Sequence, residues 1–254
     1  MLQHYQLPVY YATTLPINGS YIMKISTKNR KIGYTYGSVS GHFAFRKEKS
    51  IAFESTLERD LLTLLEFNDS VSDVIEQPVT IEYTNENGRD VTYTPDFLVF
   101  FNEPDADIMR MQRKPLLIEV KPRDRLIKDW DKLKKKFQIG IQYAHANDMI
   151  FKVYDESRIR NMYLKNILFL KRYKRLEYNE EDTMSILSLV HTNGLLSVEH
   201  ILEHLFVTQE QKGIALGQIW NMVAHKQLLC SLETPLNIKT LVWINENIEM
   251  GVSI

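Results

Sequence analysis

Features that would mark several common protein classes are missing from this sequence. It contains one cysteine, Cys230, which excludes an intramolecular disulfide framework and fits a reducing compartment. No apolar stretch approaches the roughly 20 residues that cross a bilayer, and the start lacks the basic-then-apolar plan of a signal peptide. Neither a phosphate-cradling glycine-rich loop nor a Gly-x-Ser-x-Gly elbow occurs, so nucleotide hydrolysis and serine chemistry have no support. We therefore expect a cytoplasmic protein that does not contact membranes.

An excess of charge of one sign is also lacking, because the 254 residues carry a formal net charge of −1. Phosphate neutralisation supplies much of the affinity for nucleic acids, so this balance argues at first against such a partner. The distribution answers that objection, since basic residues gather in one segment: Lys121, Arg123, Arg125, Lys128, Lys132, Lys134, Lys135 and Lys136. A helix predicted from Arg125 to Ala146 would bury the stripe Leu126, Trp130, Leu133, Phe137 and Ile141. Its lysine-rich faces fit a solvated surface and a DNA contact equally well.

What the sequence does contain is a pair of charged motifs at the ends of apolar runs. Asp96 precedes the run 97–101, and Glu119 and Lys121 lie at the end of the run 116–120. Both runs predict buried strands. Because side chains alternate along a strand, Glu119 and Lys121 project to one face and Val120 to the other. We expect Asp96, Glu119 and Lys121 to share one site.

Carboxylates and a lysine in this arrangement are typical of metal-dependent phosphodiester cleavage. Oxygen ligands suit Mg²⁺ or Mn²⁺, so Asp96 and Glu119 are candidate metal ligands. Lys121 would hold or activate the attacking water, or stabilise charge on the phosphate. The structural alternative is an edge strand that ends in a solvated glutamate and lysine.

Two upstream motifs favour the catalytic interpretation. Ser55 opens a helical pattern with Glu58 in its first turn, so Glu58 is a candidate site residue, a capping-box residue, or both. Gln77 precedes a predicted hairpin with alternating apolar residues that leads into Asp96. Gln77 lies near the site or only braces the hairpin.

The motifs Ser-x-Leu-Glu, Glu-Gln-Pro, Tyr-Thr-Pro-Asp-Phe-Leu-Val and Ile-Glu-Val-Lys-Pro, in this order, resemble the catalytic domain of the TnsA family. TnsA is the restriction-endonuclease-like subunit of a heteromeric cut-and-paste transposase. The resemblance implies a catalytic set of Glu58, Asp96, Glu119 and Lys121, with Mg²⁺ or Mn²⁺ held by the three carboxylates and the Val120 carbonyl. Family members vary at the position that matches Glu119, where glutamine can occur.

The resemblance also implies an activity and partners. The expected reaction is hydrolysis of the 5′-end strand at transposon ends in double-stranded DNA, at the bacterial nucleoid. The expected partners are an RNase H-like transposase subunit, which cuts the 3′ ends, and an AAA+ ATPase regulator. Two alternatives remain: a free-standing restriction or repair nuclease with the same site, and a non-catalytic winged-helix DNA-binding regulator.

The order of predicted elements divides the chain into four segments. We expect an α/β fold: a strand-and-loop arm over 1–50, then a restriction-endonuclease-like PD-(D/E)xK domain over 51–157, with a mixed sheet flanked by helices. A basic linker helix is expected over 158–178, and a mostly helical, winged-helix-like domain over 179–254. The third helix of that domain has few basic residues, which argues against sequence-specific DNA recognition. The resemblance implies instead that the domain docks on the regulator and helps to hold DNA.

Overall fold

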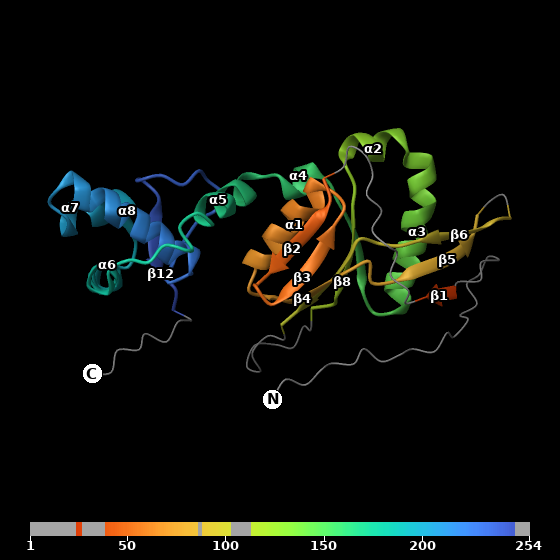
Figure 1. Cartoon of the computed structure of the whole chain (residues 1–254), viewed down its shortest axis with the longest axis horizontal. Helices are drawn as coiled ribbons and strands as arrows, with labels where there is room; N and C mark the ends of the chain where they lie inside the picture. Colours follow the sequence, from red (N-terminus) through yellow and green to blue (C-terminus); the bar gives the residue numbers. More distant parts are fainter. Residues whose placement is uncertain (1–23, 27–38, 86–87, 103–112, 247–254) are drawn as a thin grey trace, which may run out of the picture. The chain divides into compact units, whose positions relative to one another are not determined.

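The computed structural model describes residues 24–26, 39–85, 88–102 and 113–246. It divides into two compact units, residues 1–159 and 160–254 (Figure 1). Of the expected N-terminal arm, residues 1–23 and 27–38 lie outside the described residues. None of the described helices combines the length and apolarity needed to span a membrane.

The first unit is built on a mixed four-stranded sheet with the strand order β4-β7-β8-β9. Its strands are β4 (Val71–Glu76), β7 (Phe97–Phe101), β8 (Leu116–Val120) and β9 (Ile150–Tyr154). The pair β8–β9 is parallel, and the other two pairs are antiparallel. Val99, Leu117 and Ile118 are fully buried, as the two apolar runs predicted.

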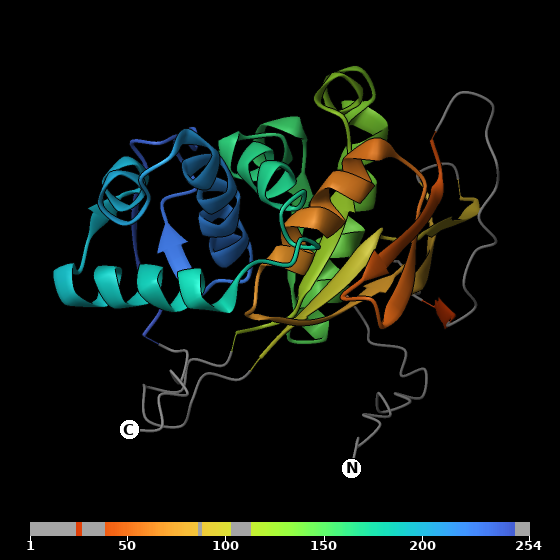
Figure 2. The same cartoon turned by 60° about the vertical axis from the view of Figure 1, so that its left-hand side comes forward.

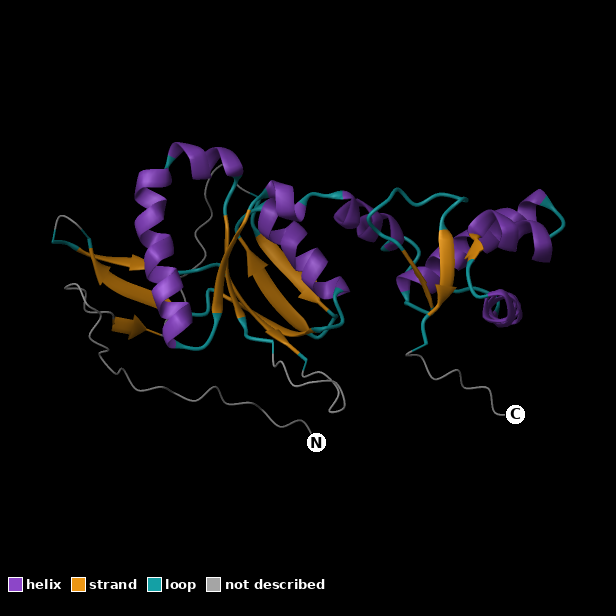
Figure 3. Cartoon of the chain, turned by 180° about the vertical axis from the view of Figure 1, so that it is seen from behind, coloured by secondary structure: helices purple, strands orange, loops and turns teal. Residues whose placement is uncertain are grey.

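Helices lie on both sides of this sheet, which confirms the expected restriction-endonuclease-like class. Helix α1 (Thr56–Phe67) covers one face and α3 (Trp130–Ala146) the other (Figure 3). Two short helices, α2 (Arg123–Lys128) and α4 (Glu156–Ile159), follow β8 and β9 respectively. On the α3 side, Leu98 and Leu117 pack with Ala144.

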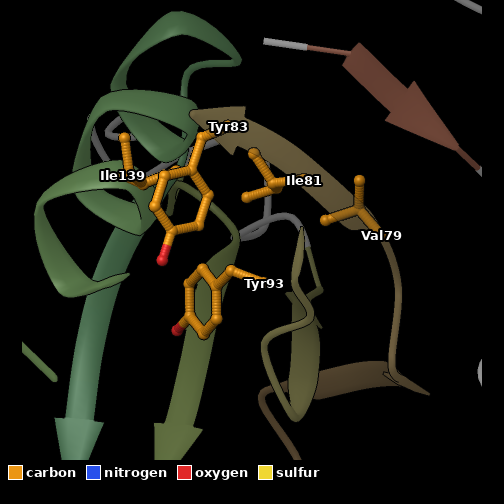
Figure 4. Packing of buried hydrophobic residues seen from close by; sticks show 5 residues of the cluster. All are labelled: Val79, Ile81, Tyr83, Tyr93 and Ile139. Atoms are coloured by element: carbon orange, nitrogen blue, oxygen red, sulfur yellow. The ribbon is translucent and has the colours of Figure 1, made fainter. Parts of the chain in front are cut away.

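Two smaller sheets complete the unit. The predicted hairpin forms as β5 (Thr80–Thr84) and β6 (Asp90–Tyr93), and β1 (Lys24–Ser26) pairs with β5. A second hairpin joins β2 (Gly41–Phe45) to β3 (Lys49–Phe53). The β5–β6 hairpin packs on α3 through a cluster of five buried residues shown in Figure 4: Val79, Ile81, Tyr83, Tyr93 and Ile139.

The prediction of one helix over residues 125–146 is wrong in two respects. The chain breaks at Asp129, which ends α2 before α3 begins, and it turns sharply there in Figure 1. Of the predicted buried stripe only Phe137 is buried, while Trp130 and Ile141 are 50% and 53% exposed. The buried face of α3 instead carries the small residues Gly140 and Ala144, beside Phe137 and Ile139.

The described part of the second unit contains four helices and a three-stranded antiparallel sheet of order β10-β12-β11. Its helices are drawn in teal and blue in Figure 2. Its elements are α5 (Met162–Leu170), α6 (Glu180–Asn193), β10 (Leu196–Ser197), α7 (Val198–Leu205), α8 (Gln209–Ala224), β11 (Leu228–Cys230) and β12 (Leu241–Ile244).

Local sequence explains where these helices begin. Ser197 caps α7, and a capping box of Thr208 and Gln211 starts α8. Ile219, Met222 and Val223 of α8 are buried as expected, but Ile214 is 57% exposed, contrary to its predicted inward position. In the segment expected as a linker, α5 buries Leu164, Ile167 and Leu170.

Candidate active site

Two acidic residues lie where the pairing of β7 and β8 ends. The paired register stops with Phe97 opposite Ile118, and Asp96 and Glu119 are the next residues beyond that pair. Asp96 lies at a bend just before β7, and Glu119 lies within β8. The two carboxyl groups are close enough for the charge of Glu119 to raise the pKa of Asp96. The two predicted site residues therefore lie side by side.

Asp96 is held by the backbone on three sides. Its N–H donates to the Ile118 carbonyl at 3.1 Å, and its carbonyl accepts from the Gln77 N–H at 2.8 Å. Its carboxylate oxygen Oδ2 accepts from the Val120 N–H at 2.7 Å. The side chain thus takes the place of a backbone acceptor where the ladder between β7 and β8 ends.

Burial raises the pKa of the Asp96 carboxyl well above its ordinary value, and the nearby charges of Glu119 and Glu58 raise it further. Lys121 and the Val120 N–H oppose this shift without cancelling it. The carboxylates of Asp96, Glu119 and Glu58 therefore lie close enough to repel one another, and Lys121 compensates this repulsion only in part.

Glu119 is buried, and both of its oxygens have partners. Oε1 lies 2.9 Å from the Lys121 ammonium, and Oε2 accepts from the Tyr93 hydroxyl at 3.0 Å. Glu119 and Lys121 therefore lie on one side of the chain, as alternation predicted. In Figure 4 the Tyr93 ring packs beside Tyr83, with its hydroxyl turned away from Val79 and Ile81.

Lys121 remains a cation in this setting. Burial lowers the pKa of its ammonium group, but Glu119, Asp96 and Glu58 together raise it, and the net shift is upward. The side chain is 31% exposed, so the charge can reach a molecule bound at the surface.

Ser55 caps α1, but Glu58 does not complete the expected capping box, because its carboxylate accepts from the Glu54 N–H and not from the Ser55 N–H. The Glu58 N–H donates to Ser55 Oγ at 3.1 Å, while its carboxylate accepts from the Ser55 hydroxyl and from the Glu54 N–H, each at 2.8 Å. Burial is the largest cause of the raised pKa of Glu58, and Lys121 acts in the opposite direction. The structure thus brings together Glu58, Asp96, Glu119 and Lys121.

Three further residues contact this group. Gln77 has a left-handed backbone, with φ of 43°, and its side chain donates to Glu54 at 3.2 Å, so its contacts brace the chain beneath Asp96. Glu54 adds another carboxylate next to Glu58. Sequence reasoning missed both Glu54 and Tyr93. For Tyr93 a signal was present, because a tyrosine on the inner face of a strand needs a partner for its hydroxyl.

The donors around Asp96 fit a hard divalent cation. Mg²⁺ usually takes only one or two carboxylates and keeps several waters, and Asp96 and Glu119 supply that number. The Val120 carbonyl points to the same side as its N–H, toward Asp96, because both groups of a strand residue face one neighbour. Across the described ranges, no three side chains of His, Cys, Asp or Glu converge closely enough to hold a metal ion by themselves. A metal here would thus be held by Asp96, Glu119, the Val120 carbonyl and water.

Two protein-family models match the chain in sequence order. The TnsA-like endonuclease N-terminal model matches residues 68–156, and the TnsA endonuclease C-terminal model matches residues 158–232. The first match includes Asp96, Glu119 and Lys121, and Glu58 precedes it. A comparison with curated proteins gives no match.

Proposed function

Because this chain belongs to the TnsA endonuclease family, we propose that it cuts one DNA strand at each end of a transposon, at the 5′ end of the element. The reaction is hydrolysis of a phosphodiester. Water attacks the phosphorus atom, and the bond to the 3′ oxygen breaks. The products are a 3′-hydroxyl on the flanking DNA and a 5′-phosphate on the element.

The observation that carries this proposal is the grouping of Asp96 and Glu119 where β7 and β8 stop pairing, with the Lys121 ammonium 2.9 Å from Glu119. A bound Mg²⁺ or Mn²⁺ would neutralise phosphate charge and ease ionisation of the attacking water. Asp96 and Glu58 have raised pKa values because they are buried near other carboxylates. A bound cation would offset this repulsion between negative charges.

The chain's own residues have separate roles in this proposal. Asp96 and Glu119 would hold the ion, and the Tyr93 hydroxyl fixes the position of the Glu119 carboxylate. Lys121, whose raised pKa keeps it protonated at neutral pH, donates to the scissile phosphate and stabilises the charge that develops there. A protonated lysine cannot accept a proton, so this role is favoured over that of a general base. Glu58 holds the start of α1 beside these groups.

Partners enter the proposal through the family. The second unit would dock on an AAA+ regulator and help to hold DNA, while an RNase H-like transposase subunit cuts the 3′ ends. In its support, the second unit has a surface groove lined by α6 and α7, including Met184, Leu189 and Leu205. Val207 nearby in the chain is 90% exposed.

The test is strand-specific cleavage of a labelled transposon-end duplex with Mg²⁺ or Mn²⁺. Wild type is compared with Asp96→Asn and Lys121→Ala, each with and without the transposase partner. We expect nicking at the 5′ end that requires the metal and is lost in both variants. Lys114→Ala is the matched control, because Lys114 lies before the opposite end of β8 in an exposed pair with Asp148.

Two results would contradict the proposal. Cleavage that persists in Asp96→Asn and Lys121→Ala would remove the site from the chemistry. Efficient cleavage of unrelated DNA without any partner would favour a free-standing restriction or repair nuclease.

A further inference from the structure

Among the residues that the structure describes, few pack on the helical segment that follows Lys121. None of the six residues of α2 is buried, and a helix of this length is marginal without packing. Its start is tied to the end of β9, where the Arg123 N–H donates to Glu156 at 2.9 Å and the guanidinium lies 3.3 Å from Asp155. We call residues 123–136, which comprise α2, Asp129 and the first turns of α3, the α2–α3 corner.

Two large apolar side chains on this corner face solvent. Ile127 is 74% exposed and Trp130 is 50% exposed. The Trp130 ring nevertheless has a defined place, because it lies edge-on to Phe137 with ring centroids 6.3 Å apart. Phe137 in turn lies 6.0 Å from Phe151, and Phe151 lies 6.5 Å from Tyr93. Trp130 is thus the exposed end of a series of rings that reaches the partner of Glu119.

The charge of the α2–α3 corner indicates which kind of molecule binds there. Seven basic residues stand against three acidic ones, Asp124, Asp129 and Asp131, in a chain whose net charge is −1. Arg125, Lys128, Lys132 and Lys134 are exposed. The surface pair of Arg125 with Asp129, at 3.7 Å, is worth little in water. Cations around an aromatic and an aliphatic side chain suit a polyanion that also offers apolar sugar and base surfaces.

The position of the corner agrees with this chemistry. Only Pro122 separates Lys121 from Arg123, and α2 is short, so Trp130 lies no farther than about 23 Å from Lys121 along the chain. At about 3.4 Å per base pair, this spans roughly seven base pairs of B-form DNA. A duplex with one phosphate at Lys121 can therefore also contact the corner.

We infer that the α2–α3 corner is a DNA-binding surface that contacts the duplex beside the cleaved phosphate. Its basic residues neutralise phosphates, and Ile127 and Trp130 contact sugar or base edges. This inference rests on the proposed function for the identity of the substrate. It adds residues that hold the duplex in place and take no part in the chemistry.

The test measures binding of a labelled duplex to the full chain carrying Asp96→Asn, without metal, between about 50 and 200 mM salt. Arg125→Gln with Lys128→Gln should weaken binding about tenfold or more near 0.1 M salt and reduce the salt slope by about 0.9 for each phosphate that is no longer neutralised. The matched control is Arg113→Gln with Lys114→Gln, which removes the same charges from the exposed residues before β8 and should leave the slope unchanged.

The apolar contacts are tested in the same assay. Trp130→Ala should weaken binding about fivefold or more, as truncation of an interface tryptophan can, while Trp130→Phe should retain most of the affinity. Ile127→Ala should also weaken binding, whereas Ile141→Ala, which truncates an isoleucine 53% exposed farther along α3, should not.

Equal binding and equal salt slopes for the corner variants and their controls would overturn the inference, as would failure of the parent to bind duplex DNA at the lowest salt. Either result would leave the cleavage assay of Asp96 and Lys121 to stand on its own. Conversely, a chain that binds through the corner but never cuts would retain this inference and refute the proposed function.

Discussion

Asp96 has a structural contact that matters for how its role is tested. Its Oδ2 accepts the Val120 N–H, so the carboxylate closes the end of the β7–β8 ladder as well as standing among the site's charges. Alanine would remove that acceptor and leave a backbone donor without its partner, while asparagine keeps an oxygen in place.

We therefore predict different outcomes for two substitutions at this position. Both Asp96→Asn and Asp96→Ala should abolish cleavage, but only alanine should also lower the free energy of unfolding, by about 1–3 kcal/mol. Urea denaturation of the metal-free proteins measures the difference. Equal stability of the two variants would show that the Val120 contact contributes nothing.

Removal of the Tyr93 hydroxyl should act through Glu119. Tyr93→Phe keeps the ring in its buried cluster and deletes only the donor to Glu119 Oε2. Loss of a group that orients a metal ligand typically costs about 10–100-fold in metal affinity. Calorimetric titration with Mn²⁺ should show this weakening, and Tyr83→Phe, in the same cluster, is the control.

Stability should depend on pH through Asp96. Because the pKa of this carboxyl is raised in the folded protein, the folded state keeps a proton that the unfolded chain has already released. This contribution is present below the ordinary pKa of 3.8 and is lost as pH rises through the raised folded pKa.

The measurement is the stability of the metal-free wild type relative to Asp96→Asn as pH rises from acid toward neutrality. We expect the free energy of unfolding of wild type, relative to that of Asp96→Asn, to fall by up to about 1.4 kcal/mol per pH unit within that window. A constant difference between the two proteins would contradict the raised pKa.

Most of the charged residues of the candidate site could be predicted from the sequence, although they lie far apart along the chain. Asp96, Glu119 and Lys121 were predictable because each adjoins an apolar run whose period fixes its direction. Tyr93 was not predicted, because its partner depends on how the β5–β6 hairpin folds toward β8, 26 residues away.

Among the elements, α3 depends on a glycine for its close approach to the sheet. A Cβ built on Gly140 would lie 2.7 Å from the ring of Phe151, which is held between Tyr93 and Phe137. A glycine elsewhere in a helix lacks this constraint, since a Cβ on Gly213 in α8 would meet nothing within 4 Å.

Alanine at these two glycines should have opposite effects. Gly140→Ala should destabilise the first unit by about 1–3 kcal/mol, because the extra methyl overpacks the contact with Phe151. Gly213→Ala should stabilise the second unit by about 0.5–1 kcal/mol through helix propensity. Chemical denaturation checks both, and a neutral Gly140→Ala would mean that the Phe151 ring moves aside without cost.

The same glycine explains why the predicted stripe of α3 was wrong. The prediction followed large apolar residues at three- and four-residue spacing and so included Trp130 and Ile141. The helix instead faces the sheet with Gly140 and Ala144, whose small size permits close packing but gives no hydrophobic signal. The break at Asp129 has no strong local signal in the sequence, since neither proline nor glycine marks it.

Each of the two units buries apolar side chains of its own among the described residues. The proposed metal ligands Asp96 and Glu119 both belong to the first. A ligand that binds only the folded form of one unit stabilises that unit alone.

Thermal unfolding should therefore show two transitions, with only one that responds to metal. Addition of Mg²⁺ or Mn²⁺ should raise the first unit's melting temperature and leave the second unchanged, as followed by calorimetry. Gly140→Ala and Gly213→Ala assign each transition to its unit. The same metal shift in Asp96→Asn would place the ion elsewhere.

The series of rings that ends at Trp130 has an optical consequence. Of the three tryptophans in the chain, Trp130 alone belongs to the first unit, since Trp220 and Trp243 belong to the second. It is half exposed, and its ring packs against the aromatic series that leads to Tyr93 and Glu119. In a protein with Trp220 and Trp243 replaced by phenylalanine, the indole emission comes from the nuclease unit alone. The chain thus carries its own fluorophore in the unit that holds the candidate site.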